Sequence, residues 1–203
     1  YGAYLYSRMD STADGVTWDK EVATGEPFGR YGHEMTAFQD ALWVMGGQNL
    51  DTTLNDAWKS EDGVNWVQVT ENLPFAMKNS LAVALKDKLW IFNQDYVWNT
   101  EDGVEWEQVL AETPWGGSPT SCVEHDGDLW MTVTDRSDLN DVSYSVWTST
   151  AGRTWIKVTD PAPWKTPRRS CLLVDYKGNL IMAGGGYDVW QWQPVCDGLF
   201  SKK

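Results

Sequence analysis

Tryptophan recurs along this sequence at an interval of 40 to 50 residues. The segments that carry it align without gaps: GVTWDKEV at 15–22, GVNWVQVT at 63–70, GVEWEQVL at 103–110 and GRTWIKVT at 152–159. The four tryptophans are 48, 40 and 49 residues apart. A repeat of this length is one supersecondary unit, which buries its apolar faces by stacking on further copies. The chain is therefore expected to fold as a row of similar small units.

Three other marker series keep the same interval. One is a tryptophan eight residues before each of the last three tryptophans above, a series that Trp190 continues. The second is a Leu-Trp pair, and the third is a proline followed by an aromatic residue. Together the four series account for 13 of the 14 tryptophans. The members of these three series are Trp58, Trp98, Trp147 and Trp190; Leu42-Trp43, Leu89-Trp90, Leu129-Trp130 and the variant Leu180-Ile181; and Pro27-Phe28, Pro74-Phe75, Pro114-Trp115 and Pro163-Trp164.

Each repeat reads as four short strands, a to d, with turn residues between them. Strand a is an alternating apolar run such as 33–38 or 171–176, and strand b carries the Leu-Trp pair. Strand c contains the tryptophan of segments such as NDAWKS, and strand d follows a tight EDG or TAG turn. Runs of this length between Gly, Asp and Asn are typical of β-strands. No stretch of 12 residues has a helical period, so we predict an all-β fold with almost no helix.

Four-stranded units at this interval are typical of β-propeller blades, between which large aromatic side chains fill a widening wedge. We expect one propeller domain over 1–203, with strands c and d in 1–28, full blades at 29–75, 76–115 and 116–164, strands a to c in 165–195, and a tail at 196–203. The N-terminal strand d around Trp18 would complete the last blade. A closed four-bladed ring and a part of a larger ring both stay open.

Two sets of motifs carry a family resemblance. Gly46-Gly47 after strand b and the segment RYGH at 30–33 resemble the kelch repeat, which implies a propeller of the galactose-oxidase-like group. The copper ligands and the Cys–Tyr crosslink of galactose oxidase have no counterpart here. Segments 11–18, 60–66, 100–106 and 149–155 resemble the Asp-box of sialidase-type propellers, with a spacing that is one residue short in three copies. In those propellers the Ser or Thr and the Asp cap the c–d hairpin, which implies a structural role.

The charge balance excludes several kinds of partner. Lys and Arg total 16 against 29 Asp and Glu, a formal net charge of -13. Such a surface repels nucleic-acid phosphates and anionic membranes, and no apolar run approaches the roughly 20 residues of a membrane span. Cysteines at 122, 171 and 196 are too few for a disulfide framework or a zinc site. The sequence establishes no compartment, with a secreted or extracellular location preferred, and the start at Tyr1 implies a removed segment or a partial chain.

Basic residues are scarce, so their positions matter. Arg30, Arg168 and Arg169 come just before a strand a, at the channel end of the face that carries the b–c loops, and His33 follows Arg30 on the same inner strand. Guanidinium groups bind carboxylates in a bidentate manner. These four residues are therefore a candidate site for an anion or a sugar acid, a ligand class that sialic-acid-processing kelch propellers suggest by analogy. The alternative is that the arginines pair with neighbouring acidic residues.

The longest b–c loop, 134–141, is a candidate calcium site. Asp135, Asp138 and Asp141 supply carboxylate oxygens at close intervals, and these are ligands that Ca²⁺ prefers. The loop lacks the glycine and the terminal glutamate of a 12-residue calcium loop, so a solvated turn is the alternative. No other cofactor is expected.

The sequence contains no catalytic motif. The two histidines, His33 and His125, belong to different repeat positions, and neither lies near a nucleophile elbow. Our leading interpretation is a non-enzymatic binding or scaffold propeller that recognises a protein or a glycan through its b–c loop face. One alternative is a lectin or an enzyme acting on a small sugar or sugar acid at an axial site. Another is a structural subunit of a larger assembly, in which a second chain completes or caps the propeller.

Overall fold

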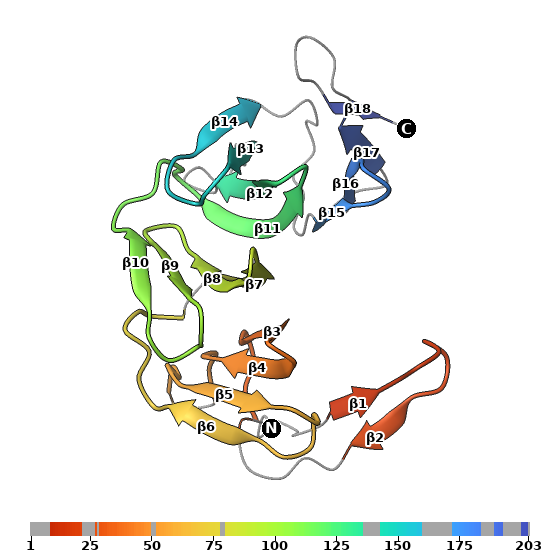
Figure 1. The fold of residues 1–203 in the computed structure, drawn as a ribbon, viewed down its shortest axis with the longest axis vertical. Coiled ribbons are helices and arrows are strands. Elements are labelled where there is room, and N and C mark those ends of the chain that lie inside the picture. Colours follow the sequence, from red (N-terminus) through yellow and green to blue (C-terminus); the bar gives the residue numbers. More distant parts are fainter. Residues whose placement is uncertain are drawn as a thin grey trace, which may run out of the picture. The chain divides into compact units, whose positions relative to one another are not determined.

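The computed structural model describes residues 9–21, 27, 29–49, 52–77, 80–135, 143–159, 172–183, 189–192 and 200–202. Every regular element in this part of the chain is a β-strand, and the strands form antiparallel sheets (Figure 1). Four sheets have four strands each, and a fifth has two. The all-β fold built from four-stranded antiparallel units, which the repeat predicts, is confirmed.

Each four-stranded sheet contains one repeat, with strands a to d in the order of the chain. The two-stranded sheet pairs β1 (Met9–Ser11) with β2 (Asp19–Glu21). The first four-stranded sheet contains β3 (Glu34–Phe38), β4 (Ala41–Met45), β5 (Ala57–Ser60) and β6 (Val67–Thr70). The second contains β7 (Leu81–Leu85), β8 (Lys88–Phe92), β9 (Val97–Thr100) and β10 (Glu107–Leu110). The third contains β11 (Ser118–His125), β12 (Asp128–Asp135), β13 (Ser143–Ser149) and β14 (Ile156–Thr159). The fourth contains β15 (Leu172–Asp175), β16 (Leu180–Ala183), β17 (Val189–Trp192) and β18 (Phe200–Lys202).

The chain divides into two compact units. The first unit comprises residues 1–78, 82–89 and 100–106, and the second comprises residues 79–81, 90–99 and 107–203. The second four-stranded sheet contributes residues to both units. The first unit therefore holds the whole of the first sheet, and the second unit holds the third and fourth.

The turn from strand a to strand b has the same backbone form in all four four-stranded sheets. Its two central residues both have positive φ angles, between 49° and 82°. Two successive residues of this kind make a type I′ turn, whose twist matches that of the flanking antiparallel strands. These pairs are Gln39-Asp40, Lys86-Asp87, Asp126-Gly127 and Lys177-Gly178.

The turn from strand c to strand d is held by one hydroxyl and one carboxylate. In the first sheet the amide of Gly63 donates to Ser60 Oγ at 2.9 Å, and the amide of Val64 donates to Asp62 Oδ1 at 2.8 Å. Thr100 and Asp102 hold the corresponding turn of the second sheet in the same way. In the third sheet Ser149 accepts from Gly152 at 2.9 Å, and Ala151 occupies the Asp position. The Asp-box-like segments are therefore capped c–d hairpins.

The N-terminal copy of this turn begins one residue later than the sequence analysis expected. The amide of Gly15 donates to Thr12 Oγ1 at 2.9 Å, so Thr12 takes the place assigned to Ser11. Counted from Thr12, this copy has the same spacing to its tryptophan as the other three. The expected difference in spacing is wrong, because two adjacent hydroxyl residues made the start of the motif ambiguous.

Two strand-b tryptophans, Trp43 and Trp90, pack against a glycine in the c–d turn of the next sheet. A Cβ atom added to Gly103 would lie 2.1 Å from Cη2 of Trp43, and one added to Gly152 would lie 2.5 Å from Cη2 of Trp90. Both glycines also have positive φ angles, 78° and 73°. The indole ring therefore needs a residue without a side chain at this point. This contact explains why the Leu-Trp pair and the turn glycine recur at one interval.

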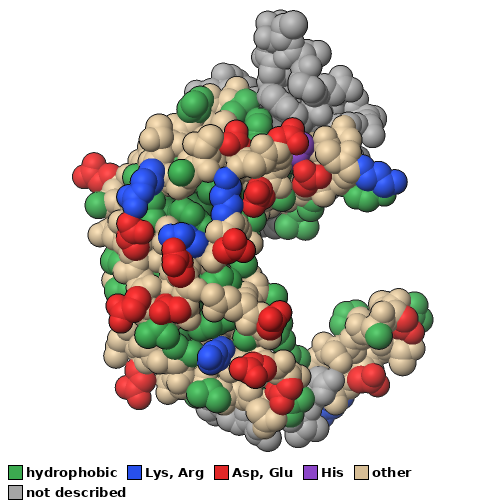
Figure 2. All heavy atoms as spheres, in the orientation of Figure 1, with side chains coloured by type: hydrophobic (Ala, Val, Ile, Leu, Met, Phe, Trp, Pro, Cys, Tyr) green, Lys and Arg blue, Asp and Glu red, His purple; other side chains and the backbone are tan. Residues whose placement is uncertain are grey.

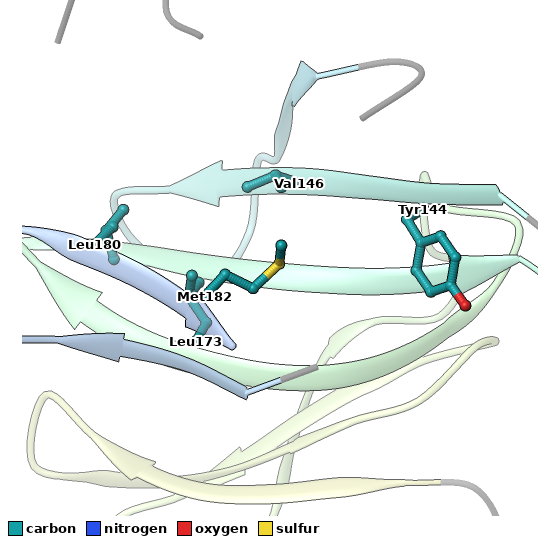
Figure 3. Packing of buried hydrophobic residues seen from close by; sticks show 5 residues of the cluster. All are labelled: Tyr144, Val146, Leu173, Leu180 and Met182. Atoms are coloured by element: carbon teal, nitrogen blue, oxygen red, sulfur yellow. The ribbon is translucent and has the colours of Figure 1, made fainter. Parts of the chain in front are cut away.

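In the second unit, an apolar cluster joins the third and fourth sheets (Figure 3). Tyr144 and Val146 from β13 are buried with Leu173 from β15 and with Leu180 and Met182 from β16. The inner strands are also linked by a hydrogen bond, because the amide of Leu173 donates to Ser121 Oγ at 2.9 Å. Stacking of neighbouring sheets therefore combines apolar burial with a polar contact between strands a.

Most of the described tryptophans are buried or half-buried, as the wedge predicts, but Trp18 is not. Its side chain is 60% exposed. The expectation of a core position is wrong for this residue, because Trp18 directly precedes β2, whose sheet has only two strands and covers less surface than a sheet of four. The buried tryptophans are Trp43, Trp66, Trp90, Trp115, Trp147 and Trp155, and the half-buried ones are Trp58, Trp98, Trp106 and Trp130.

The outer strand of the fourth sheet corrects the expected organisation of the ends. β18 pairs with β17 through Trp192↔Phe200 and two further residue pairs. Residues 200–202, which the sequence analysis placed in a tail, therefore form the outer strand of the last repeat, the position for which the region around Trp18 was expected. The sequence signal for this strand was the dipeptide Asp197-Gly198, which matches Asp62-Gly63 and Asp102-Gly103 in two other repeats. Closure of a ring stays a prediction.

The surface reflects the acidic composition. Figure 2 shows Asp and Glu side chains spread over the described residues, with fewer Lys and Arg among them. Across the part of the chain that the structure describes, no helix has the length and apolar character needed to cross a membrane.

Candidate functional site

The two ends of a four-stranded sheet are built differently. Because consecutive strands run antiparallel, the a–b and c–d turns lie at one end, here called the turn end, and the b–c and d–a connections lie at the other, here called the loop end. The turn end repeats the same short turns in sheet after sheet. The b–c connection, by contrast, has 11 residues between β4 and β5, four between β8 and β9, and seven between β12 and β13. The loop end is therefore where one sheet differs from the next.

At the loop end of the first sheet, three extended segments lie side by side. Tyr31 and Gln48 form an antiparallel bridge with two backbone hydrogen bonds of 2.9 Å, and Gln48 is also bridged to Thr53. Residues directly opposite each other in an antiparallel pair project to the same face. The side chains of Tyr31, Gln48 and Thr53 therefore form a row on one face, here called the Tyr31 row. Tyr31 is 51% exposed, Gln48 is half-buried and Thr53 is exposed.

Two glycines allow these segments to approach closely. A Cβ atom on Gly47 would lie 2.9 Å from both the Cβ of His33 and the carbonyl oxygen of Tyr31. One on Gly46 would lie 2.3 Å from the Cβ of Met77. Both glycines have positive φ angles, 92° and 60°. The Gly-Gly pair, which the sequence analysis read as a kelch-like mark, is a packing requirement of this loop.

A buried ion pair supports the row from within the first unit. The Arg30 guanidinium binds the Asp56 carboxylate in a bidentate manner at 2.7 and 3.0 Å, and it also donates to the carbonyl of Gly46 at 2.8 Å. Trp58 Nε1 donates to the same carboxylate at 2.7 Å. Burial raises the pKa of Asp56, but the hydrogen bonds from Arg30 and Trp58 outweigh it and hold the pKa below its usual value. The Arg30 side chain is only 5% exposed, so its charge is matched inside the protein.

Asn55 ties the same loop to the connection that follows β6. Its Nδ2 donates to the carbonyl of Leu73 at 2.8 Å, and its Oδ1 accepts from the amide of Met77 at 3.3 Å. The amide of Leu73 in turn donates to the carbonyl of Asn55 at 2.8 Å. The b–c and d–a connections of the first sheet are thus held together as one hydrogen-bonded platform.

The structure brings two of the predicted ligand-binding residues into this platform. Arg30 is buried against Asp56, so the predicted alternative of pairing with an acidic neighbour is what the geometry shows for it. His33 is exposed, and partial desolvation and then the Arg30 charge lower its pKa. Arg168 and Arg169 lie outside the described residues. A ligand-binding role for these four residues stays a prediction.

The calcium site also stays a prediction. Asp135 is half-buried at the end of β12, while Asp138 and Asp141 lie outside the described residues. Within the described ranges, no group of three or more His, Cys, Asp or Glu side chains is placed to hold a metal ion.

Sequence reasoning missed several residues of this region. Tyr31, Gln48 and Thr53 are separated in the sequence and form no recognisable motif. They are brought together only by the backbone bridges between their segments. Glu34 was read as part of an alternating strand, but it is a half-buried carboxyl whose pKa is raised by burial, although it accepts a 3.3 Å hydrogen bond from the amide of Ala82. A carboxyl within an apolar inner strand was the available signal for it.

Comparisons with known proteins support the architecture. The family model described as the DUF6242 beta propeller domain matches residues 12–118. A solved structure titled "Structure of YjhT" resembles the chain with a TM-score of 0.67 at 15% sequence identity, over 85% of this chain and 64% of that chain. At this identity the likeness shows the fold alone, and the chain spans about 64% of the length of the protein that it matches. No curated protein matches the sequence.

Proposed function

The chain belongs to the DUF6242 beta propeller domain family, and we propose that it is a non-enzymatic binding or scaffold domain that recognises its partner through the loop end. The propeller fold supplies a rigid frame, and binding residues are commonly found on loops that such a frame positions. Fold alone does not identify a function, so the proposal depends on the site.

The observation that carries the proposal is the contrast between the two ends of the sheets. Every c–d turn described in detail uses the same hydroxyl cap, whereas the first b–c connection is an individual platform held by Arg30, Asp56 and Asn55. A structural repeat needs no such individual platform, since the second sheet joins β8 to β9 with four residues. The Tyr31 row offers an aromatic ring, an amide and a hydroxyl on a platform that is already ordered, which lowers the entropy cost of binding.

Binding arrays test this proposal. The chain is applied to printed arrays of glycans and of proteins, and any ligand found is then titrated against two variants. We expect Tyr31→Ala/Gln48→Ala/Thr53→Ala to lose binding, and the matched turn-end variant Glu61→Ala/Val104→Ser, also at exposed positions, to keep it. Loss of binding in the turn-end variant alone would contradict the proposal.

A second function, a lectin or an enzyme for a sugar or sugar acid at an axial site, is favoured by Glu34. A half-buried carboxyl with a raised pKa on an inner strand is suited to general acid–base chemistry. Glu34→Gln would abolish turnover in that case, and it would leave a binding domain with its ligand affinity unchanged. A kelch-type repeat, a calcium ion in the 134–141 loop and a role as a subunit of a larger assembly also remain proposals. Molar mass in solution tests the last of these.

A further inference from the structure

We propose that the Tyr31 row binds an uncharged saccharide. This inference rests on the proposed function and names the ligand class for the same site. It differs from the sugar-acid site that the arginines suggested, because the structure assigns the Arg30 charge to Asp56.

The charges around the row argue against an acidic ligand. Arg30 has both terminal nitrogens occupied by Asp56, with a further bond to a backbone carbonyl. Partial burial and then the Arg30 charge lower the pKa of His33, which favours its neutral form. Neither residue presents a cation to a carboxylate, and the chain carries a net charge of -13, which repels anions. The exposed groups of the row are themselves all uncharged.

The size of the row argues for a small ligand. Neighbouring extended segments lie about 4.8 Å apart, so the row across three segments spans about 10 Å. One or two sugar rings cover that distance. A stable protein interface needs about 800 Å² from each partner, which is far more than three side chains supply.

The chemistry of the row fits a ring with hydroxyl groups. The half-exposed Tyr31 ring offers a flat apolar face to sugar C–H groups, with a hydroxyl at its edge. The Gln48 amide both donates and accepts hydrogen bonds, and so does the Thr53 hydroxyl. A sugar hydroxyl both donates and accepts hydrogen bonds, so it is matched by groups that do the same. A carboxylate only accepts and an ammonium group only donates.

Titration calorimetry with defined oligosaccharides tests the inference. The probes are cellohexaose, maltohexaose, mannohexaose and xylohexaose as neutral ligands, and hexagalacturonate and sialyllactose as acidic ones. We expect at least one neutral probe to bind. Tyr31→Ala should then weaken binding about tenfold, as loss of an aromatic contact worth about 1.4 kcal/mol predicts. Tyr31→Phe should keep most of the affinity, since it retains the ring.

The matched control is Tyr176→Ala, which removes a tyrosine of similar exposure, 57%, elsewhere in the chain. It should leave the affinity unchanged. Binding of the acidic probes alone, or neutral binding that Tyr31→Ala does not weaken, overturns the inference. A partner that binds through the loop end but is a protein also overturns it, while the proposed function stands. If no array ligand depends on the loop end, the proposed function fails as well.

Discussion

The turn end and the loop end of the first sheet use the same kinds of interaction for different purposes. At the turn end, Ser60 and Asp62 satisfy the backbone of a hairpin that recurs along the chain. At the loop end, the Arg30–Asp56 ion pair holds a platform that the four-residue b–c connection of the second sheet has no room to repeat. Repetition thus marks what the fold requires, and the exception to the repeat is the place for which we propose an individual function.

The largest effect is expected at the base of the loop end. Asp56→Ala leaves the Arg30 guanidinium buried without its carboxylate, which typically destabilises a protein by about 3–5 kcal/mol. We expect a loss of that size in the free energy of urea unfolding. Replacing both partners by Arg30→Met/Asp56→Leu should cost less than Asp56→Ala alone. A change below about 1 kcal/mol for Asp56→Ala would show that the pair does not support the platform.

At the turn end, the second-largest loss of stability is expected for substitution of Gly103, the glycine that packs against Trp43. Gly103→Ala places a Cβ atom 2.1 Å from the indole ring, at a φ angle of 78°. Overpacking and left-handed strain together predict a loss of about 3 kcal/mol. Gly15→Ala is the matched control, because it has a similar φ angle and nothing within 4 Å, and it should cost about 1 kcal/mol. Equal losses for the two variants would mean that Trp43 does not fill the wedge.

Each hydroxyl cap is expected to contribute less to the free energy of unfolding than the ion pair or the glycine. Ser60→Ala removes the acceptor for the amide of Gly63, and Ser60 is buried, so the loss should be about 1 kcal/mol. Ser60→Thr keeps the hydroxyl and should retain most of the stability. Urea unfolding of the two variants measures the difference. If Ser60→Ala unfolds at the same urea concentration as the unaltered chain, the cap contributes nothing.

Acid should weaken the turn end. Hydrogen bonds from the amides of Thr17 and Val16 lower the pKa of Asp14 to about 2, and amide hydrogen bonds likewise lower the pKa values of Asp62 and Asp102. A depressed pKa contributes stability above the unfolded value of about 3.9, and this contribution is lost as pH falls through the folded value. The urea midpoint should therefore fall between about pH 4 and 2. In the variant Asp62→Asn/Asp102→Asn, the urea midpoint should fall less steeply with pH. A pH dependence equal to that of the unaltered chain would contradict a stabilising role for these carboxylates.

The smallest effect on stability is expected in the Tyr31 row. Tyr31→Ala removes a half-exposed ring and leaves its backbone bridge to Gln48 in place. A substitution of this kind changes the free energy of unfolding by about 0.5 kcal/mol or less. Thermal unfolding measures it. A loss above about 2 kcal/mol would make Tyr31 a structural residue and remove the main support for its role in binding.

The parts that were predictable from sequence are those set by local chemistry. Each Leu-Trp pair, each DG turn and each Ser or Thr cap is a motif of only a few neighbouring residues. The sheets and the capped hairpins could therefore be predicted from these motifs. The Arg30–Asp56 pair was not predictable, because 26 residues separate its members and several acidic residues were equally available. The Tyr31 row depends on backbone bridges between loop segments, which have no periodic signal. β18 was missed because its repeat lacks a strand-d tryptophan, although the sequence contains the dipeptide Asp197-Gly198.

The central claim is that the turn end stabilises the fold and the loop end binds the ligand. Two triple variants, measured for both stability and ligand binding, test it most directly. One is the loop-end variant Tyr31→Ala/Gln48→Ala/Thr53→Ala, and the other is the turn-end variant Ser60→Ala/Thr100→Ala/Ser149→Ala, whose three hydroxyls are all buried. We expect the loop-end variant to lose its ligand and to keep its free energy of unfolding within about 1 kcal/mol of the unaltered chain. The turn-end variant should lose about 3 kcal/mol and, where still folded, bind with unchanged affinity. A loop-end variant that unfolds, or a turn-end variant that stays stable and loses its ligand, would contradict these separate roles of the two ends.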